Sequence, residues 1–205
     1  MDGVAQVSVD SADKVSFSKA LRSILRHDPD VIMIGEIRDQ ETGNIAVEAA
    51  LTGHLVCSTL HTNSSVETIT RLVNMGIPNY LISSSVSLVI GQRLARKICQ
   101  KCKIEDKNSS AKLLKQMKLP SDLKPMVGKG CKECNNSGYK GRQGIYEILK
   151  ITEDLQDGIL KNLTIPEMES VAKKEGFLSM QEVGAGYIRE GFLSLEEYQR
   201  TLFIS

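Results

Sequence analysis

The sequence contains no tryptophan, few other aromatic residues and no long apolar run. Aromatic residues make up 4% of the 205 residues, which argues against a surface that stacks the bases of single-stranded nucleic acid. The longest aliphatic runs have about four residues, as at 31–34, whereas a transmembrane helix needs about 20. The amino end also lacks the basic and apolar regions of a secretory signal. We therefore expect neither a membrane span nor an export signal.

The overall composition is that of a folded protein, but charge is unevenly distributed. Hydrophobic residues make up 41% and charged residues 25%, which excludes disorder for most of the chain. The formal net charge is +1, yet residues 96–150 carry 14 Lys and Arg against 5 Asp and Glu. A basic middle between acidic flanks indicates separate modules. The basic stretch matches either an acidic protein surface or a nucleic acid or anionic lipid, and the first is favoured.

Four of the five cysteines form two Cys-x-x-Cys pairs, Cys99 with Cys102 and Cys131 with Cys134. Two such pairs supply four thiolates to one tetrahedral Zn(2+), and a site filled by four sulfur ligands is structural. Thioredoxin-like redox chemistry is the alternative, but it does not explain two pairs. The segment between the pairs is longer than usual and is interpreted as an insertion. Cys57 lies in an apolar run and is expected to be a small buried residue.

Apolar periodicity predicts alternating strands and helices in the first hundred residues, which indicates an α/β layer fold. Since few strands precede residue 98, this resembles the second half of a sheet. The run at 31–34 is expected to be buried on both faces, as in a parallel sheet. The expected strands are 5–9, 31–34 and 55–60, and the expected helices are 17–28 with Ser16 as N-cap, 42–51, 64–76 and 80–97.

The predicted secondary structure of the second half of the chain differs from that of the first hundred residues. Residues 144–149 could form one more strand, and short helices follow from residue 152. Three capping boxes begin these helices: Thr164 with Glu167, Ser179 with Glu182, and Ser194 with Glu197. We therefore expect three domains: an α/β core (1–98), a tetracysteine zinc-binding module (99–150) and a C-terminal helical domain (151–205).

Polar residues follow two of the predicted strands. The run at 31–34 leads into Gly35 and Glu36, and a carboxylate at the carboxyl end of a parallel strand faces the crevice where ligands bind. In a nucleotide-hydrolysing site it would act on magnesium or water, and Gly35 would leave the approach to the phosphates open. His54 and His61 bracket the strand at 55–60, so His61 and Glu36 share an edge if the strands are neighbours. A solvated strand end and structural histidines are the alternatives.

Several motifs together resemble the secretion ATPases that drive type II secretion and assemble type IV pili. They are the segment 28–39 that ends in Gly-Glu-Ile-Arg-Asp, the two halves of a histidine box at 51–54 and 60–63, the Gly-Gln-Arg-Leu at 91–94, and the segment 141–147. The resemblance covers nearly the whole chain. In this family the tetracysteine module is typical of secretion and pilus-extension ATPases and is lacking in retraction ATPases.

The resemblance implies a partial RecA-like P-loop ATPase core that works as a hexameric ring. Glu36 would be the Walker B acid, His54 and His61 the histidine-box residues, and Arg38 and Asp39 would help couple nucleotide state to ring shape. The implied ligands are ATP, Mg(2+) and Zn(2+), and the implied partner is an inner-membrane platform protein, with no nucleic acid. The protein would be cytoplasmic and peripheral to the inner membrane. The expected catalytic residues are Glu36, His61 and His54, and the expected cofactor-binding residues are Gly35, Glu36, Arg38, Asp39 and His61.

One family motif is absent from this sequence. No lysine is followed by Ser or Thr and preceded by the glycines of a Gly-x-x-x-x-Gly-Lys-Ser/Thr loop, so most of the phosphate cradle is missing. We expect a fragment of a longer protein, or a truncated gene product, with negligible ATPase activity of its own. Two alternatives remain: a catalytically inactive, zinc-stabilised module that docks secretion partners, and a zinc-ribbon nucleic-acid binder, which the lack of aromatic residues among the lysines disfavours.

Overall fold

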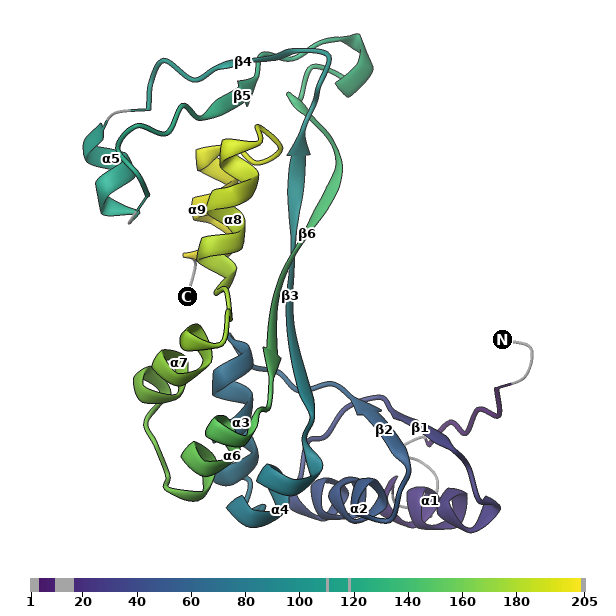
Figure 1. The fold of residues 1–205 in the computed structure, drawn as a ribbon. Helices are drawn as coiled ribbons and strands as arrows, with labels where there is room; N and C mark the ends of the chain where they lie inside the picture. The colour runs from purple at the N-terminus through teal and green to yellow at the C-terminus, as the bar shows by residue number, and fades with distance from the viewer. Residues whose placement is uncertain (1–3, 10–16, 110, 118, 204–205) are drawn as a thin grey trace. The chain divides into compact units, whose positions relative to one another are not determined.

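The computed structural model describes residues 4–9, 17–109, 111–117 and 119–203, which divide into two compact units (Figure 1). The first unit comprises Met1–Val89 and Lys150–Glu175, and the second comprises Ile90–Leu149 and Gly176–Ser205. The helices of the C-terminal region are thus shared between the units. The three predicted domains stay a prediction.

The first unit is built around two parallel strands, β1 (Val31–Ile34) and β2 (Leu55–Ser58). Helices α1 (Phe17–Ile24) and α2 (Gln40–Leu51) cover one face of this pair (Figure 1). Leu21 and Ile45 pack there against Ile32 and Ile34. The remaining elements of the unit are the 3-10 turn η1 (Leu25–His27), α3 (Ser65–Asn74), α4 (Asn79–Ser85), α6 (Glu153–Leu160) and α7 (Ile165–Lys174).

The second face of this strand pair is exposed. Val31 is 60% exposed, Met33 69% and Leu55 58%, and Cys57 is exposed on the same face. Two predictions are therefore wrong: the run at 31–34 is not buried on both faces, and Cys57 is not a core residue. The physical reason is that no described helix covers this face, so only alternate residues reach an apolar neighbour.

Two other predicted elements differ. Residues 4–9 form no strand and are mostly exposed, because no described segment pairs with their backbone and a strand without a partner is not stable. The predicted helix 80–97 is also wrong, since α4 ends at Ser85 and β3 (Leu88–Ile98) follows. The hydroxyls of Ser84 and Ser85 donate to carbonyls of the preceding turn, which is typical of a helix end. The predicted N-cap Ser16 lies outside the described residues.

The second unit is organised by β3, which pairs with β6 (Tyr139–Lys150). The predicted strand 144–149 is thus confirmed and is longer than expected. A small antiparallel pair, β4 (Lys103–Glu105) with β5 (Met126–Gly128), lies between the cysteine pairs. The unit also contains α5 (Ala111–Gln116), the 3-10 turn η2 (Lys132–Cys134), α8 (Met180–Arg189) and α9 (Leu195–Leu202).

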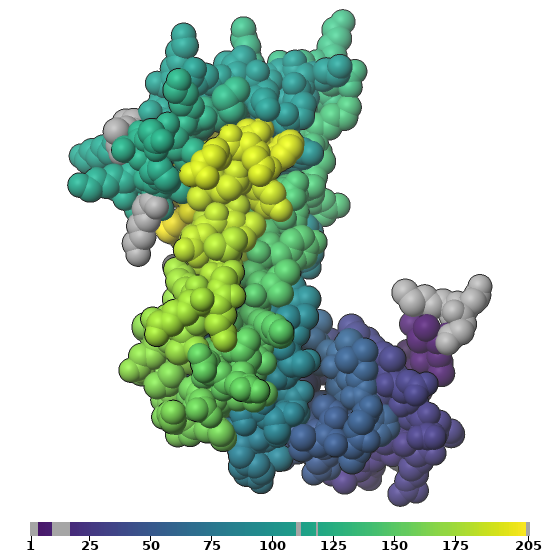
Figure 2. All heavy atoms as spheres, in the orientation of Figure 1, coloured from purple at the N-terminus to yellow at the C-terminus, as the bar shows by residue number. Residues whose placement is uncertain are grey.

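The segment between the cysteine pairs takes part in the core of this unit. Leu114, Met117 and Leu119 are buried in one cluster with residues of β3, β6, α8 and α9, including Ile145 and Tyr198. Figure 2 shows the described part of this segment, in teal, beside α8 and α9, in yellow. The insertion is therefore a packed part of the unit.

The predicted helix starts are largely confirmed. Thr164 and Ser179 each form a reciprocal capping box with the glutamate three residues later. Ser194 accepts a hydrogen bond from the Glu197 amide, but the Glu197 carboxylate binds Arg96 and Arg200 and does not return to the cap. Within the described residues, no helix has the length and apolar character needed to cross a bilayer.

Candidate functional sites

The first candidate site lies where β1 and β2 end. The register pairs Val31 with Leu55 and Ile34 with Ser58, so the residues after both strands emerge at one edge of the sheet. The Nε2 atom of His61 lies 3.3 Å from the Oε2 atom of Glu36. The structure therefore brings together the acid and the histidine that the sequence placed after separate strands.

Glu36 is held as a carboxylate. The Arg38 guanidinium donates to its Oε1 atom, and this hydrogen bond lowers the pKa of Glu36 below its usual value, against a smaller opposing effect of desolvation. The charges of Arg38 and His61 act in the same direction. The Glu36 side chain is 27% exposed and that of His61 is 91% exposed. An ionised, accessible carboxylate can accept a proton from water or bind a divalent cation.

The other predicted residues of this site occupy different positions. Asp39 is the N-cap of α2, where its Oδ1 atom accepts a hydrogen bond from the Thr42 amide (2.8 Å). His54 precedes β2, at the opposite end from His61, and its Nδ1 atom lies 2.9 Å from the carbonyl oxygen of Ala49. The structure thus places His54 at the end of α2 and does not bring it to Glu36. Its catalytic role stays a prediction.

The space beside Gly35 is open. A Cβ atom built there meets no described atom within 4 Å, so packing within the described residues does not demand a glycine. This agrees with an unobstructed approach to Glu36, and the binding role of Gly35 stays a prediction.

Sequence reasoning missed Thr59, which lies just beyond β2. Its hydroxyl donates to the Gly35 carbonyl (2.6 Å), and its own carbonyl accepts from the Ile37 amide (3.0 Å). Thr59 therefore binds both neighbours of Glu36. Thr59 fell inside the predicted strand 55–60, and its hydroxyl within that apolar run was the available signal.

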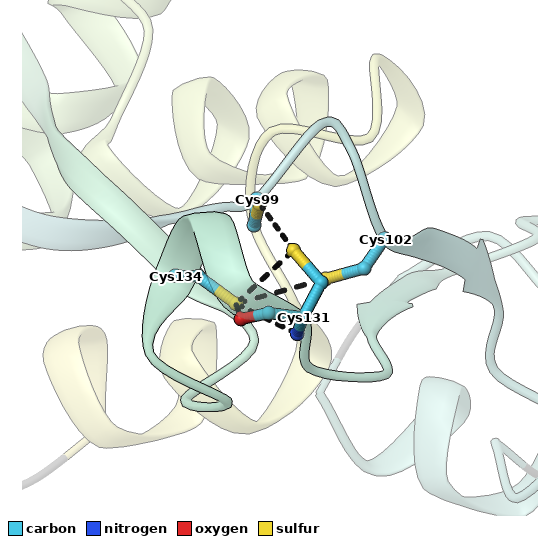
Figure 3. A group of neighbouring side chains, drawn as sticks. All are labelled: Cys99, Cys102, Cys131 and Cys134. Atoms are coloured by element: carbon cyan, nitrogen blue, oxygen red, sulfur yellow. Dashed lines mark hydrogen bonds between the residues drawn. The ribbon is translucent and has the colours of Figure 1, made fainter.

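The second candidate site is the cysteine cluster (Figure 3). The four Sγ atoms lie within 4.8 Å of one another. The Cys99–Cys131 and Cys102–Cys134 sulfur pairs are 3.9 Å apart, and Cys131–Cys134 is 3.7 Å apart. A tetrahedral Zn(2+) with bonds of about 2.3 Å separates its sulfur ligands by about 3.8 Å. All four cysteines are free, and the donor set fits zinc.

Backbone amides support this cluster. The Gly130 amide donates to the Cys102 sulfur (3.3 Å) and the Cys131 amide donates to that of Cys134 (3.2 Å). Burial raises the pKa of Cys102 to about 12 despite the Gly130 amide. Burial also acts against ionisation of Cys134, but the amides of Cys131 and Gly138 outweigh it and lower its pKa to about 6. Since thiolates are the metal ligands, metal binding would release protons from this cluster.

Comparison with solved structures shows that this α/β fold is similar to that of known ATPases. One is the pilus retraction motor PilT with bound ADP, with a TM-score of 0.64, 28% identity, and coverage of 93% of this chain and 44% of that one. Another is the Legionella pneumophila ATPase DotB, with a TM-score of 0.60, 26% identity, and coverage of 90% of this chain and 42% of that one.

Sequence comparison shows the family. Residues 1–200 match the family model described as "Type II/IV secretion system protein". The chain is 48% identical over 204 residues to the type IV pilus assembly ATPase PilB of Pseudomonas aeruginosa and 43% identical over 205 residues to the type II secretion system ATPase E of Vibrio cholerae. These alignments cover 98% of this chain but 36% and 40% of the relatives. The chain belongs to the type II/IV secretion system protein family, and the predicted resemblance is confirmed.

Proposed function

We propose that this chain belongs to an ATPase that powers type II secretion or type IV pilus assembly. The observation that carries the proposal is the Glu36–His61 pair at the shared end of β1 and β2. Relatives named as a type IV pilus assembly ATPase and a type II secretion system ATPase match nearly the whole chain. The chain spans only 36% and 40% of those relatives, so the activity is proposed for a longer polypeptide that includes it.

The described residues fit one side of a nucleotide site. Bound Mg(2+)·ATP would supply the phosphoryl group and a divalent charge. Glu36 would accept a hydrogen bond or a proton from the attacking water, or bind the hydrated cation. His61 would hold the Glu36 carboxylate in place and present its exposed ring toward the phosphates. The sequence has no Gly-x-x-x-x-Gly-Lys-Ser/Thr loop, so the phosphate cradle must come from elsewhere in the polypeptide.

Further parts of the proposal follow from the family. The core would be RecA-like and assemble as a hexameric ring, and residues 99–150 would hold a structural Zn(2+). The partner would be an inner-membrane platform protein, and the protein would be cytoplasmic and peripheral to that membrane. The alternative of an inactive docking module is less favoured, because such a module has no need for an ionised acid paired with a histidine at a sheet edge.

The test is Glu36→Gln in the longer ATPase. The substitution keeps the shape of the side chain and removes its charge, so ATP turnover should fall roughly 100-fold or more while nucleotide binding persists. Glu41→Gln is the matched control, since Glu41 is an exposed acid in the first turn of α2 that contacts Arg22. A Glu36→Gln protein with unchanged turnover would contradict the proposal.

A further inference from the structure

We propose that Thr59 is a positioning residue that fixes Glu36 beside His61. The effect of Thr59 on ATP hydrolysis rests on the proposed function. Its effect on the position of Glu36 is argued from the contacts of Thr59 alone.

Thr59 contacts the backbone on both sides of Glu36. The peptide group before Glu36 offers the Gly35 carbonyl, which accepts from the Thr59 hydroxyl at 2.6 Å. The peptide group after it offers the Ile37 amide, which donates to the Thr59 carbonyl at 3.0 Å. One residue therefore restrains the backbone of Glu36 at two points.

This restraint lies where the strand pairing has ended. The last paired residues are Ile34 of β1 and Ser58 of β2. Beyond them, the segment after β1 leads to Glu36 and the segment after β2 leads to His61. The contacts of Thr59 carry the pairing past that point. Because Thr59 is only two residues before His61, the contacts that hold the backbone of Glu36 also restrict the position of the His61 backbone.

The consequence is that the 3.3 Å contact between Glu36 and His61 depends on the Thr59 hydroxyl. Without the Thr59 hydroxyl, the segments that follow β1 and β2 separate. Glu36 and Arg38 belong to the same segment and remain paired. His61 belongs to the segment after β2, so its ring moves away from Glu36. Small displacements of an acid or base lower catalytic rates strongly, so Thr59 would act on the reaction through Glu36.

The experiment is a double-mutant cycle read by NMR on the 205-residue chain. At fixed pH, Glu36→Gln should move the imidazole ¹H–¹⁵N signals of His61, because the charged neighbour is lost. In a Thr59→Val background this response should fall by about half or more. The response requires the contact between Glu36 and His61, and the contact is lost when Thr59 no longer maintains it. Valine keeps the branched shape and removes the hydroxyl.

Two matched controls accompany this variant. Thr59→Ser keeps the hydroxyl and should retain the full response. Thr62→Val removes another hydroxyl of the same segment, which contacts Thr68 at 2.9 Å, and should also retain it. If Thr59→Val lowers the unfolding temperature but leaves the His61 response intact, Thr59 is a structural residue only and the inference is wrong.

A measurement on the unmodified chain covers the case in which Thr59→Val does not fold. The Ile37 amide should exchange with solvent at least about tenfold more slowly than an unbonded amide. Exchange at the unbonded rate would overturn the inference. None of these readouts needs nucleotide, so they are separate from the Glu36→Gln turnover test of the proposed function.

Discussion

The guanidinium of Arg96, on β3, donates two hydrogen bonds to the carboxylate of Glu197 in α9, at 2.9 and 2.7 Å. The Arg96 amide donates to the other carboxylate oxygen at 2.7 Å, and Arg200 also binds this carboxylate. The Glu197 side chain has no exposed area. This buried acid therefore joins α9 to the long strand pair that leads into the cysteine cluster.

Glu197→Gln should destabilise the second unit by about 2–4 kcal/mol, because two arginines lose a fully buried partner. Chemical denaturation followed by circular dichroism would measure the loss. The matched control is Glu196→Gln, since Glu196 is 75% exposed and lies 3.9 Å from Arg96; that variant should change stability by less than about 0.5 kcal/mol. Equal effects of the two variants would contradict the anchoring role.

The same residue predicts sensitivity to acid. Burial opposes the ionisation of Glu197, but Arg200 and Arg96 outweigh it and lower its pKa from 4.5 to about 2. A lowered folded-state pKa stabilises the fold above the unfolded value of 4.5, and this contribution disappears as the pH falls toward 2. It amounts to about 3 kcal/mol. Unfolding free energies measured between pH 6 and pH 3 should fall less steeply in Glu197→Gln than in the unmodified chain.

Gly35→Ala should leave stability unchanged to about 1 kcal/mol, because a Cβ at this position meets nothing within 4 Å. In contrast, a Cβ at Gly43 in α2 would lie 2.5 Å from the buried Ile77 side chain, so Gly43→Ala should cost about 1–3 kcal/mol. Thermal unfolding of both variants tests the difference. A strong loss of stability in Gly35→Ala would show that Gly35 is required for folding and would remove the argument for a ligand approach.

Purified protein should contain one zinc ion per chain, bound by Cys99, Cys102, Cys131 and Cys134. Metal binding at such sites supplies on the order of 10 kcal/mol, so a chelator should raise hydrogen exchange throughout residues 99–143. Cys131→Ser should lose the metal, whereas Cys57→Ser should keep it, because Cys57 belongs to the other unit. Absence of zinc by elemental analysis, or unchanged exchange after chelation, would refute the prediction.

The basic stretch 96–150 should bind no nucleic acid more tightly than the roughly micromolar non-specific range. We expect it to face acidic protein surface, and residues 151–205 supply ten acidic residues against five basic ones. Some of the basic residues are already occupied, since Arg96 binds Glu197 and Lys140 binds Glu133 at 2.7 Å. Fluorescence anisotropy with duplex and single-stranded DNA at physiological salt is the measurement. Nanomolar affinity would favour the zinc-ribbon alternative.

The sequence by itself determined the features that depend on local chemistry or on spacing. Serine and threonine caps fix helix starts through neighbouring amides, so α3, α7 and α8 were predicted from a few residues each. The spacing of the two Cys-x-x-Cys pairs likewise predicts a four-sulfur cluster. The motif at 28–39 and the two histidines gave the family, which the comparison with known proteins confirms.

Only the tertiary structure decided the features that depend on a distant partner. Residues 88–98 have apolar positions compatible with a helix, but their pairing with β6, some fifty residues later, makes them a strand, since long-range packing overrides local propensity. The sequence placed His61 beside Glu36 only if the two strands are neighbours. The parallel pairing of β1 and β2 shows that they are, and it places His54 at the other end of the strand. The two contacts of Thr59 and the burial of Glu197 likewise arise where segments distant in the sequence pack together. No local sequence pattern encodes that packing.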